Sequence, residues 1–507
     1  MSIKLCMLAG ALGLAPLAGL AAAPAVQGPE SVADWDRAGK AFIAQAKAQP
    51  MYNHRARNVI LFVGDGMGVS TQTAARILEG QLRGQPGEEN RLAFETLPFS
   101  ALSKTYSWDQ QTSDSAPTMS AIMTGHKTRD GMLSVDHTTA KNECDADKVA
   151  QRSLPTLLEL AARAGRATGV VSTARITHAT PGATYAHTPM RDWEADSDIR
   201  VPGCGVKDIA RQLIELSPEV RQSLKIAMGG GRSYFLPKTD ADLEYPDIKG
   251  RRNDGRNLVQ EWLKSRGPAS AYVWNKAQFD ALDVQRVDHV LGLFEPSHMQ
   301  YESDRAKDPA GEPSLAEMTD KAIRLLQAKG QQGWFLHVEG GRIDHAHHAG
   351  NAQRALVDTI ALSDAVRRAM SLTDASDTLI IVTADHSHTF TMAGYPHRGN
   401  PILGLVHDNA RVDGQPPRLT LDANGLPYTT LGYANGPGHR GPGPRVQLTA
   451  AQTMDLNFLQ EATIPMGSET HGGEDVAIWA RGPMAHLVRG SMEQNWIFHV
   501  MREAFGF

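Results

Sequence analysis

The sequence predicts an α/β protein built on a large, mostly parallel central sheet with helices on its faces. Three apolar runs, residues 59–63, 334–338 and 378–383, are continuous rather than alternating, which is typical of parallel strands buried on both faces. Each run leads within two residues to a carboxylate. Ligands of such sheets gather beyond the carboxyl ends of the strands. The pattern therefore favours an enzyme with acidic groups collected at one edge of the sheet.

Length and composition suit one large domain. The chain has 507 residues, which alone would suggest about three domains of ~150 residues each. Candidate ligands, however, run from Asp65 to His471, so we expect a single domain with insertions. A hydrophobic share of 41% is ordinary for a globular protein. A formal net charge of -5, with no basic run interleaved with aromatic residues, argues against a nucleic-acid-binding platform.

The first part of the domain is expected to alternate helices and strands. Residues 31–48 form an amphipathic helix that Ser31 and Asp34 can cap. The apolar run gives a strand at 58–64, and a glycine-rich turn leads from it to a helix at 70–78.

Periodicity and turn residues predict the remaining elements. Residues 113–117 open a helix over 118–123, because Pro117 suits a first turn, where a missing N–H costs nothing. Further segments predict helices at 154–164, 315–329 and 353–370 and a strand at 167–172. The stretch 397–444 is dense in Gly and Pro and has no helical period. It is typical of an inserted, turn-rich subdomain, because the chain must return to the core at His471.

The N-terminus is typical of a secretory signal peptide over residues 1–25. Lys4 supplies the positive end, residues 7–20 the apolar stretch, and residues 21–25 a small-residue cleavage site. A membrane anchor is the alternative, but the apolar stretch is short and Pro16 interrupts it.

The remaining residues, 26–507, are expected to form the catalytic domain of a periplasmic or secreted protein. No other segment approaches the ~20 apolar residues of a membrane span. The sequence also ends without the hydrophobic tail that a lipid anchor of the GPI type needs. We therefore expect no membrane anchor in the mature chain.

Removal of the signal peptide would take Cys6 with it and leave Cys144 and Cys204. An even pair in an exported protein favours a disulfide over two free thiols. Two cysteines alone would make a poor zinc site. The loop between them is long enough for a bridge to contribute about 4 kcal/mol on the chain-entropy model.

Two pairs of residues indicate divalent metal ions. Asp344 and His348 stand four residues apart without Pro or Gly between them, so on a helix they share one face. Asp385 and His386 follow a buried strand. The alternatives are a surface histidine tract for the first pair and a helix N-cap for the second. Glu339 just before the first pair favours a site; oxygen donors suit Mg²⁺ and nitrogen-rich sets suit Zn²⁺.

Ser115 is the candidate nucleophile. It stands where a helix is expected to begin, and the N–H groups and dipole of a helix N-terminus favour an alkoxide or a phosphate. A serine hydroxyl needs a base or a metal ion to activate it. No Gly-x-Ser-x-Gly motif surrounds Ser115, so a metal ion is favoured. Ser113 is the rival, with N-capping as its simpler role.

These residues lie in motifs that make the chain resemble the alkaline phosphatase family from roughly residue 31 to residue 507. The motifs are Asp-Gly-Met-Gly at 65–68, Asp-Ser-Ala at 114–116, and the segments 338–345, 383–386 and 469–475. Segments 256–263 and 482–487 are more similar to the animal tissue enzymes than to the best-known bacterial ones.

The resemblance implies roles for individual residues. Ser115 would become phosphorylated, Asp114 would position Arg191, and Arg191 would hold the phosphate, since a planar guanidinium can hold two oxygens at once. Two zinc sites and one magnesium site are implied. The ligands are Asp344, His348 and His471 for the first zinc ion, Asp65, Asp385 and His386 for the second, and Asp65, Thr180 and Glu339 for magnesium.

Three more histidines and one loop follow from the same resemblance. His388 would support a zinc-bound carboxylate. His178 and His345 replace an aspartate and a lysine of the bacterial pattern, and a softer imidazole near the third ion leaves open whether that ion is strictly Mg²⁺. Animal-type enzymes also carry calcium, and the ligands implied here are Glu244, the Phe294 carbonyl, Glu295 and, across an insertion after Asp308, Glu312. A homodimer is implied, with 397–444 as a crown-like insertion at its interface.

We therefore expect metal-dependent hydrolysis of small phosphate monoesters at alkaline pH through a phosphoserine intermediate. A phosphodiesterase or sulfatase with the same zinc core is the nearest alternative. A sulfatase needs an arginine two residues after Pro117, where Met119 stands, and a diesterase should lack the full cradle that Arg191 and the magnesium ligands provide. A non-catalytic zinc-binding protein is the alternative of another class, but it has no reason to place Ser115 beside metal ions.

Overall fold

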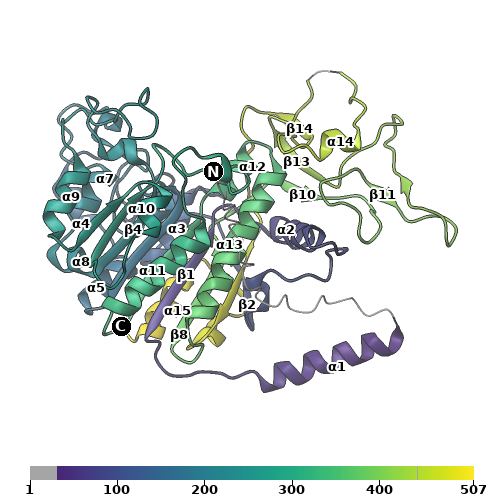
Figure 1. The fold of residues 1–507 in the computed structure, drawn as a ribbon, viewed down its shortest axis with the longest axis horizontal. Helices are drawn as coiled ribbons and strands as arrows, with labels where there is room; N and C mark the ends of the chain where they lie inside the picture. Colours follow the sequence, from purple (N-terminus) through teal and green to yellow (C-terminus); the bar gives the residue numbers. More distant parts are fainter. Residues whose placement is uncertain (1–30, 442) are drawn as a thin grey trace, which may run out of the picture.

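The computed structural model describes residues 31–441 and 443–507. The predicted signal peptide, residues 1–25, lies outside the described residues. A ten-stranded sheet runs through the body of the protein, and a smaller subdomain of short strands and loops lies beside it (Figure 1). Within the described ranges, no helix is both long enough and apolar enough to cross a membrane.

The central sheet is mostly parallel, as predicted. Its strand order is β17-β2-β16-β8-β1-β7-β3-β4-β6-β5. Seven neighbouring strands from β8 to β5 are parallel, while β16 is antiparallel to both β8 and β2. The ten strands are β1 (Asn58–Gly64), β2 (Phe99–Lys104), β3 (Ala167–Arg175), β4 (Leu224–Gly230), β5 (Ser270–Val273), β6 (His289–Leu293), β7 (Trp334–Gly340), β8 (Thr378–Ala384), β16 (Val476–Arg481) and β17 (Ser491–Glu493).

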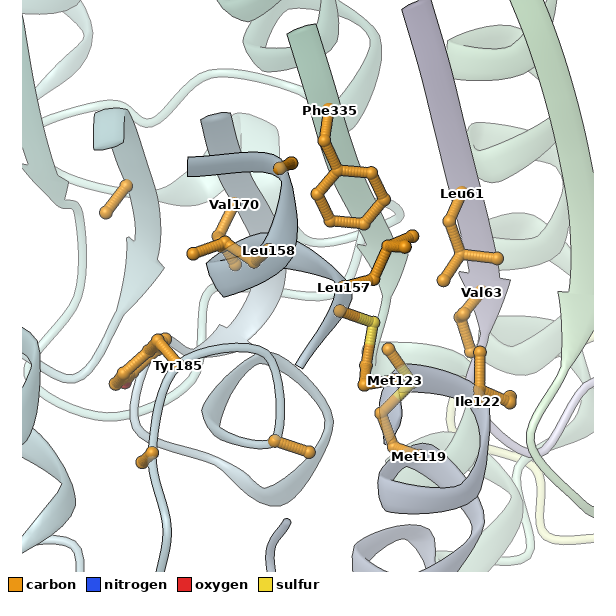
Figure 2. Packing of buried hydrophobic residues seen from close by; sticks show 14 of the residues in the cluster. Leu61, Val63, Met119, Ile122, Met123, Leu157, Leu158, Val170, Tyr185 and Phe335 are labelled. Carbon is orange, nitrogen blue, oxygen red and sulfur yellow. The ribbon is translucent and has the colours of Figure 1, made fainter. Parts of the chain in front are cut away.

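Helices cover both faces of the sheet. One layer contains α2 (Val69–Leu82), α11 (Leu315–Lys329) and α13 (Ala352–Leu372), and the other contains α3 (Ser115–Thr124), α5 (Leu157–Arg163) and α15 (Trp496–Phe505). The strand β1 contributes Ile60 and Phe62 to the first layer and Leu61 and Val63 to the second. Figure 2 shows Val63 at the end of β1 above Ile122 of α3. Burial on both faces explains why the strand reads as a continuous apolar run.

The remaining elements are short or peripheral. The other helices are α1 (Val32–Ala48), α4 (Ala146–Arg152), α6 (Ala179–Gly182), α7 (Ile209–Ile214), α8 (Pro218–Ser223), α9 (Leu258–Arg266), α10 (Lys276–Asp280), α12 (Arg342–His348) and α14 (Ala450–Thr453). The short strands are β9 (Ser387–His388), β10 (Phe390–Met392), β11 (His407–Asp408), β12 (Arg418–Leu419), β13 (Leu431–Gly436), β14 (Ala462–Pro465) and β15 (His471–Gly472).

Local capping explains where the predicted helices begin. In α1, Ser31 and Asp34 form the reciprocal capping box that satisfies two N–H groups. The helix predicted at 154–164 begins later, as α5, because Pro155 disfavours helical backbone at the residue before it. Thr156 then caps α5 by accepting the Glu159 N–H at 3.2 Å.

The small subdomain contains a three-stranded sheet in the order β10-β13-β14 and a two-stranded pair of β11 with β12. In Figure 1 it lies to one side of the main sheet, in the yellow-green part of the colour scale. Strands β10 and β14 lie just outside residues 397–444 and pair with β13 inside them. This pairing joins the turn-rich segment to the chain on either side of it.

The predicted disulfide is confirmed. Cys144 and Cys204 are joined with their Cα atoms 4.6 Å apart, across a sequence separation of 60 residues. The bridge packs against a small hydrophobic cluster that includes Met132, Val149 and Trp193. The bridge therefore joins two loop segments that share only a small hydrophobic cluster.

Replacing both cysteines by serine should lower the free energy of unfolding by about 4 kcal/mol, because the open chain regains the loop entropy. The fall in melting temperature should match the fall that reductant causes in the natural chain. Reductant should have no further effect on the double variant. An unchanged melting temperature in that variant would show that the bridge does not contribute to stability.

Candidate functional site

Three buried carboxylates lie on neighbouring strands at one edge of the sheet. Asp65 follows β1, Glu339 is the next-to-last residue of β7, and Asp385 follows β8. The registers pair Val63 with Glu339 and Gly64 with Ala384, so the strands deliver the three groups at one level. All three side chains are 0% exposed.

This crowding of negative groups has a measurable electrostatic consequence. Burial, and then the charges of Asp385 and Asp344, raise the pKa of Asp65 well above its usual range. Burial and the nearby Asp385 carboxylate raise the pKa of Glu339 to about 7. The Ser172 hydroxyl donates to Glu339 Oε2, but Oε1 of the same carboxylate is buried with no hydrogen-bond partner among the described residues. Bound cations could neutralise buried carboxylates in this arrangement.

A second cluster combines Asp344 and His348 with two further histidines. The two residues lie on α12, as the four-residue spacing predicts, with His348 Nε2 3.4 Å from Asp344 Oδ1. The antiparallel pair of β15 with β9 brings His471 and His388 to the same place. His471 Nε2 lies 3.4 Å and His388 Nε2 lies 2.8 Å from Asp344 Oδ1. Oxygen and nitrogen ligands thus converge from three elements.

Ser115 lies where these clusters meet. It is the first residue of α3, and Asp114 is the N-cap that accepts the Ala116 N–H at 3.4 Å. The Ser115 Oγ lies 3.3 Å from Asp65 Oδ1 and 3.1 Å from His386 Nε2. Its side chain therefore faces residues that could bind a metal ion, and its backbone N–H belongs to a helix N-terminus, where anions are favoured.

Arg191 is held beside this helix N-terminus by two contacts. One guanidinium nitrogen donates to Asp114 Oδ1, and the other donates to His178 Nε2 at 2.9 Å. Burial alone would raise the pKa of Asp114, but the Arg191 charge holds it below its usual value. Asp114 stays ionised and fixes the guanidinium next to Ser115. Thr180 lies close by, with its hydroxyl 3.4 Å from Asp65 Oδ2.

Comparison with known proteins agrees with this geometry. A family model described as "Alkaline phosphatase" matches residues 56–507. The tissue-nonspecific alkaline phosphatase of Gallus gallus is 45% identical over 466 residues, which are 90% of this chain and 86% of that protein. An alkaline phosphatase of Gadus morhua is 44% identical and covers 93% of this chain and 96% of its own length.

The chain belongs to the alkaline phosphatase family. It is therefore a phosphatase, and phosphate-monoester hydrolysis is the activity that this membership supports. The animal relatives confirm the predicted similarity to the tissue enzymes. The solved structure of Thermus thermophilus alkaline phosphatase, 25% identical, superposes with a TM-score of 0.62 over 91% of this chain and 93% of that one.

Two supporting residues of this phosphatase escaped the sequence reasoning. Glu469 Oε2 lies 2.5 Å from His388 Nδ1, so His388 bridges Asp344 and Glu469. Burial alone would lower the pKa of His388, but these two carboxylates raise it to about 9. The second missed residue is Ser172, the partner of Glu339. Glu469 opens a motif already noted, and only the pairing of β15 with β9 shows its partner.

A third missed residue, His298, lies beside two predicted histidines. The rings of His298 and His345 are 4.0 Å apart between centroids, and those of His298 and His178 are 5.2 Å apart. Burial and neighbouring positive charges lower the pKa values of all three imidazoles, which are therefore neutral. His298 follows β6 in a loop, and no local pattern in the sequence marks it.

Two of the residues expected to bind calcium, Glu244 and Glu295, lie together with Asp308, which the sequence reasoning had not chosen as a ligand. Glu244, Glu295 and Asp308 offer carboxylate oxygens within 4.8 Å of one another. Phe294 directly follows β6 and precedes Glu295. Glu312 lies nearby with one oxygen accepting the Gln300 N–H at 2.9 Å. Burial and the charges of Glu295 and Asp308 raise the pKa of Glu312 to about 9.

Proposed function

We propose that this phosphatase hydrolyses phosphate monoesters at alkaline pH through a phosphoserine at Ser115, with divalent metal ions as cofactors. The observation that carries the proposal is the place of the Ser115 hydroxyl. It lies at a helix N-terminus and within 3.3 Å of both Asp65 and His386. A nucleophile and an anion-binding helix end thus share one point with a set of metal ligands.

The residues present fit metal ions. Three buried carboxylates with raised pKa values and an unpartnered Glu339 oxygen would be destabilised without cations beside them. We assign Asp344, His348 and His471 to one zinc ion, Asp65, Asp385 and His386 to a second, and Asp65, Thr180 and Glu339 to magnesium. When bound, such ions lower the pKa of the serine hydroxyl and offset the charge of the phosphoryl group.

The protein's own groups account for the remaining chemistry. Ser115 Oγ forms a bond to phosphorus as the bond from phosphorus to the alcohol oxygen breaks, and the alcohol leaves with a proton. Water then cleaves the phosphoserine and releases inorganic phosphate. Arg191 holds two phosphoryl oxygens, and Asp114 keeps the guanidinium in place through its contact with Nη1. His388 orients Asp344 by donating to it at 2.8 Å.

We also propose a homodimer in the periplasm or outside the cell. The helix α1 stands apart from the body of the protein in Figure 1 and has no buried residue. Its Trp35 and Phe42 are 65% and 62% exposed. Such an apolar stripe is suited to contact with a second copy. In the same proposal, residues 1–25 are a signal peptide and residues 397–444 form a crown at the dimer interface. The disulfide is consistent with an oxidising compartment.

Hydrolysis of p-nitrophenyl phosphate should exceed that of bis-p-nitrophenyl phosphate and should rise with pH between about 6 and 11. Chelation should abolish the rate, and Zn²⁺ with Mg²⁺ should restore it, because the buried carboxylates need their cations. Metal content measured on the same samples should fall and recover in parallel. A preference for the diester would instead assign the site to a phosphodiesterase.

Ser115→Ala should lower kcat by at least about a thousandfold and leave no acid-stable phosphoenzyme, because the nucleophile is lost. Metal content should stay the same. The matched control is Ser113→Ala, since Ser113 contacts His471 only through its backbone carbonyl at 2.7 Å. That control should keep most of the activity. Equal losses in both variants would remove Ser115 from the nucleophile's role.

For the calcium site we propose Glu244, Glu295, Asp308 and the Phe294 carbonyl as ligands, with Glu312 as a neighbour. Calcium added to the chelated protein should raise its melting temperature, because the ion binds only the folded chain. Asp308→Asn should remove that rise, whereas Glu312→Gln should keep most of it. The opposite ranking would return the fourth ligand to Glu312, as the sequence resemblance implied.

A further inference from the structure

Three imidazoles beside Arg191 form a cluster for which the proposed reaction gives no complete account. His178 is the N-cap of α6, His345 lies on α12, and His298 lies in the loop that follows β6. Their ring nitrogens come within 4.8 Å of one another. His298 and His345 are only partly buried, so solvent and small ligands can reach them. We call these three residues the histidine cluster.

Each ring of the histidine cluster is in contact with one guanidinium group. The pairs are His178 with Arg191, His298 with Arg175, and His345 with Arg342. The nitrogen–nitrogen distances are 2.9 Å in the first pair and 3.0 Å in the last. A ring nitrogen that accepts from a guanidinium cannot carry a proton. The three imidazoles are therefore neutral, and their lone pairs are already engaged.

The positive charge around the histidine cluster is only partly compensated. Arg175 is paired with Glu194 at 2.6 Å, and Arg191 is paired with Asp114. Arg342 makes no ion pair with a carboxylate in the described part of the chain. Its guanidinium lies 3.8 Å from the centroid of the Tyr301 ring, and its buried Nε has no hydrogen-bond partner among those residues. The Arg342 guanidinium thus has no carboxylate in direct contact; its charge acts at longer range on the buried Asp358, where it opposes the rise in pKa that burial causes.

His298 adds an unmatched donor to this excess charge. Arg175 approaches both of its ring nitrogens, through the backbone N–H at 3.3 Å from Nδ1 and through the guanidinium at Nε2. A neutral imidazole accepts at one nitrogen and donates at the other, so one N–H of His298 faces another N–H. An anion beside the ring would accept from both donors and remove the mismatch.

These contacts favour an anion over a metal ion. Three neighbouring imidazoles could in principle bind zinc, but here a metal ion would have to displace guanidinium groups from the lone pairs and remain beside them, although two of the three are paired with carboxylates. An anion beside His298 and His345 meets mainly donors, whereas a ring nitrogen of His178 also comes within 4.8 Å of carboxylate oxygens of Asp65 and Glu339. We propose that His298, with His345 and Arg342, binds a second anionic group of the substrate, a carboxylate or a phosphate. The phosphatase then favours monoesters whose alcohol portion carries such a group; this inference rests on the proposed function.

The test compares two substrates of nearly equal size, 3-phosphoglycerate and glycerol 3-phosphate, which differ in a carboxylate and a hydroxymethyl group. At low salt kcat/KM should be higher for 3-phosphoglycerate. His298→Ala should reduce the ratio of the two kcat/KM values about tenfold, or about 1.4 kcal/mol. His298→Asn should reduce it less, because its amide still donates. The control, His499→Ala, changes an exposed histidine on α15 and should keep the ratio.

Inhibition gives a second measurement that needs no turnover. Phosphonoacetate should inhibit hydrolysis of p-nitrophenyl phosphate more strongly than ethylphosphonate, and His298→Ala should close that gap. An equal rate on both substrates in the natural chain, or an unchanged ratio in His298→Ala, would overturn the proposal. Loss of one bound zinc ion per chain in that variant would also overturn it and make the cluster a metal site. No activity on p-nitrophenyl phosphate after metal reloading would instead contradict the proposed function.

Discussion

The concentration of buried negative charge at the carboxyl edge of the sheet is the constraint on which the rest of this structure depends. Asp65, Glu339 and Asp385 are fully buried on adjacent strands. A buried ionised group without a partner costs several kcal/mol, so in the folded chain three such groups either bind cations or take up protons. Parallel strands in fixed register bring these groups together, and cations are needed to keep them charged. The sheet edge that fixes the fold therefore also creates the proposed need for bound cations.

The sequence predicted the strands at this edge because their physics is local. β1, β7 and β8 are buried on both faces, and this burial leaves a continuous apolar run that ends at a functional residue. The helix α11 could be predicted in the same way, because its helical period begins at a capping box formed by Ser314 and Glu317. These elements could be read from neighbours in the chain alone. Three site residues, Asp65, Glu339 and Asp385, lie at the ends of these strands, whereas the other candidate residues lie on separate elements and were implied by the family resemblance.

The residues that sequence reasoning missed depend on contacts between distant segments. Glu469 meets His388 across a separation of 81 residues, and only the pairing of β15 with β9 brings them together. His298 meets Arg175 across 123 residues. Asp308 comes within 4.8 Å of carboxylate oxygens of Glu244 and Glu295, and no local pattern marks that contact. No periodicity or capping rule encodes such encounters, because tertiary packing decides them.

The presence or absence of a partner of opposite charge explains how one small region can offer separate sites to cations and to anions. At the carboxylate edge the acidic groups have no arginine in direct ion-pair contact among the described residues. Metal ions are their proposed counterions. Directly before Ser115 in the chain, Asp114 pairs with Arg191 and makes it a fixed, directional donor. Arg342, on α12, makes no ion pair with a carboxylate among the described residues and lies over the Tyr301 ring. Acidic and basic groups thus lie in neighbouring clusters, and we propose that the first binds cations and the second an anionic part of the substrate.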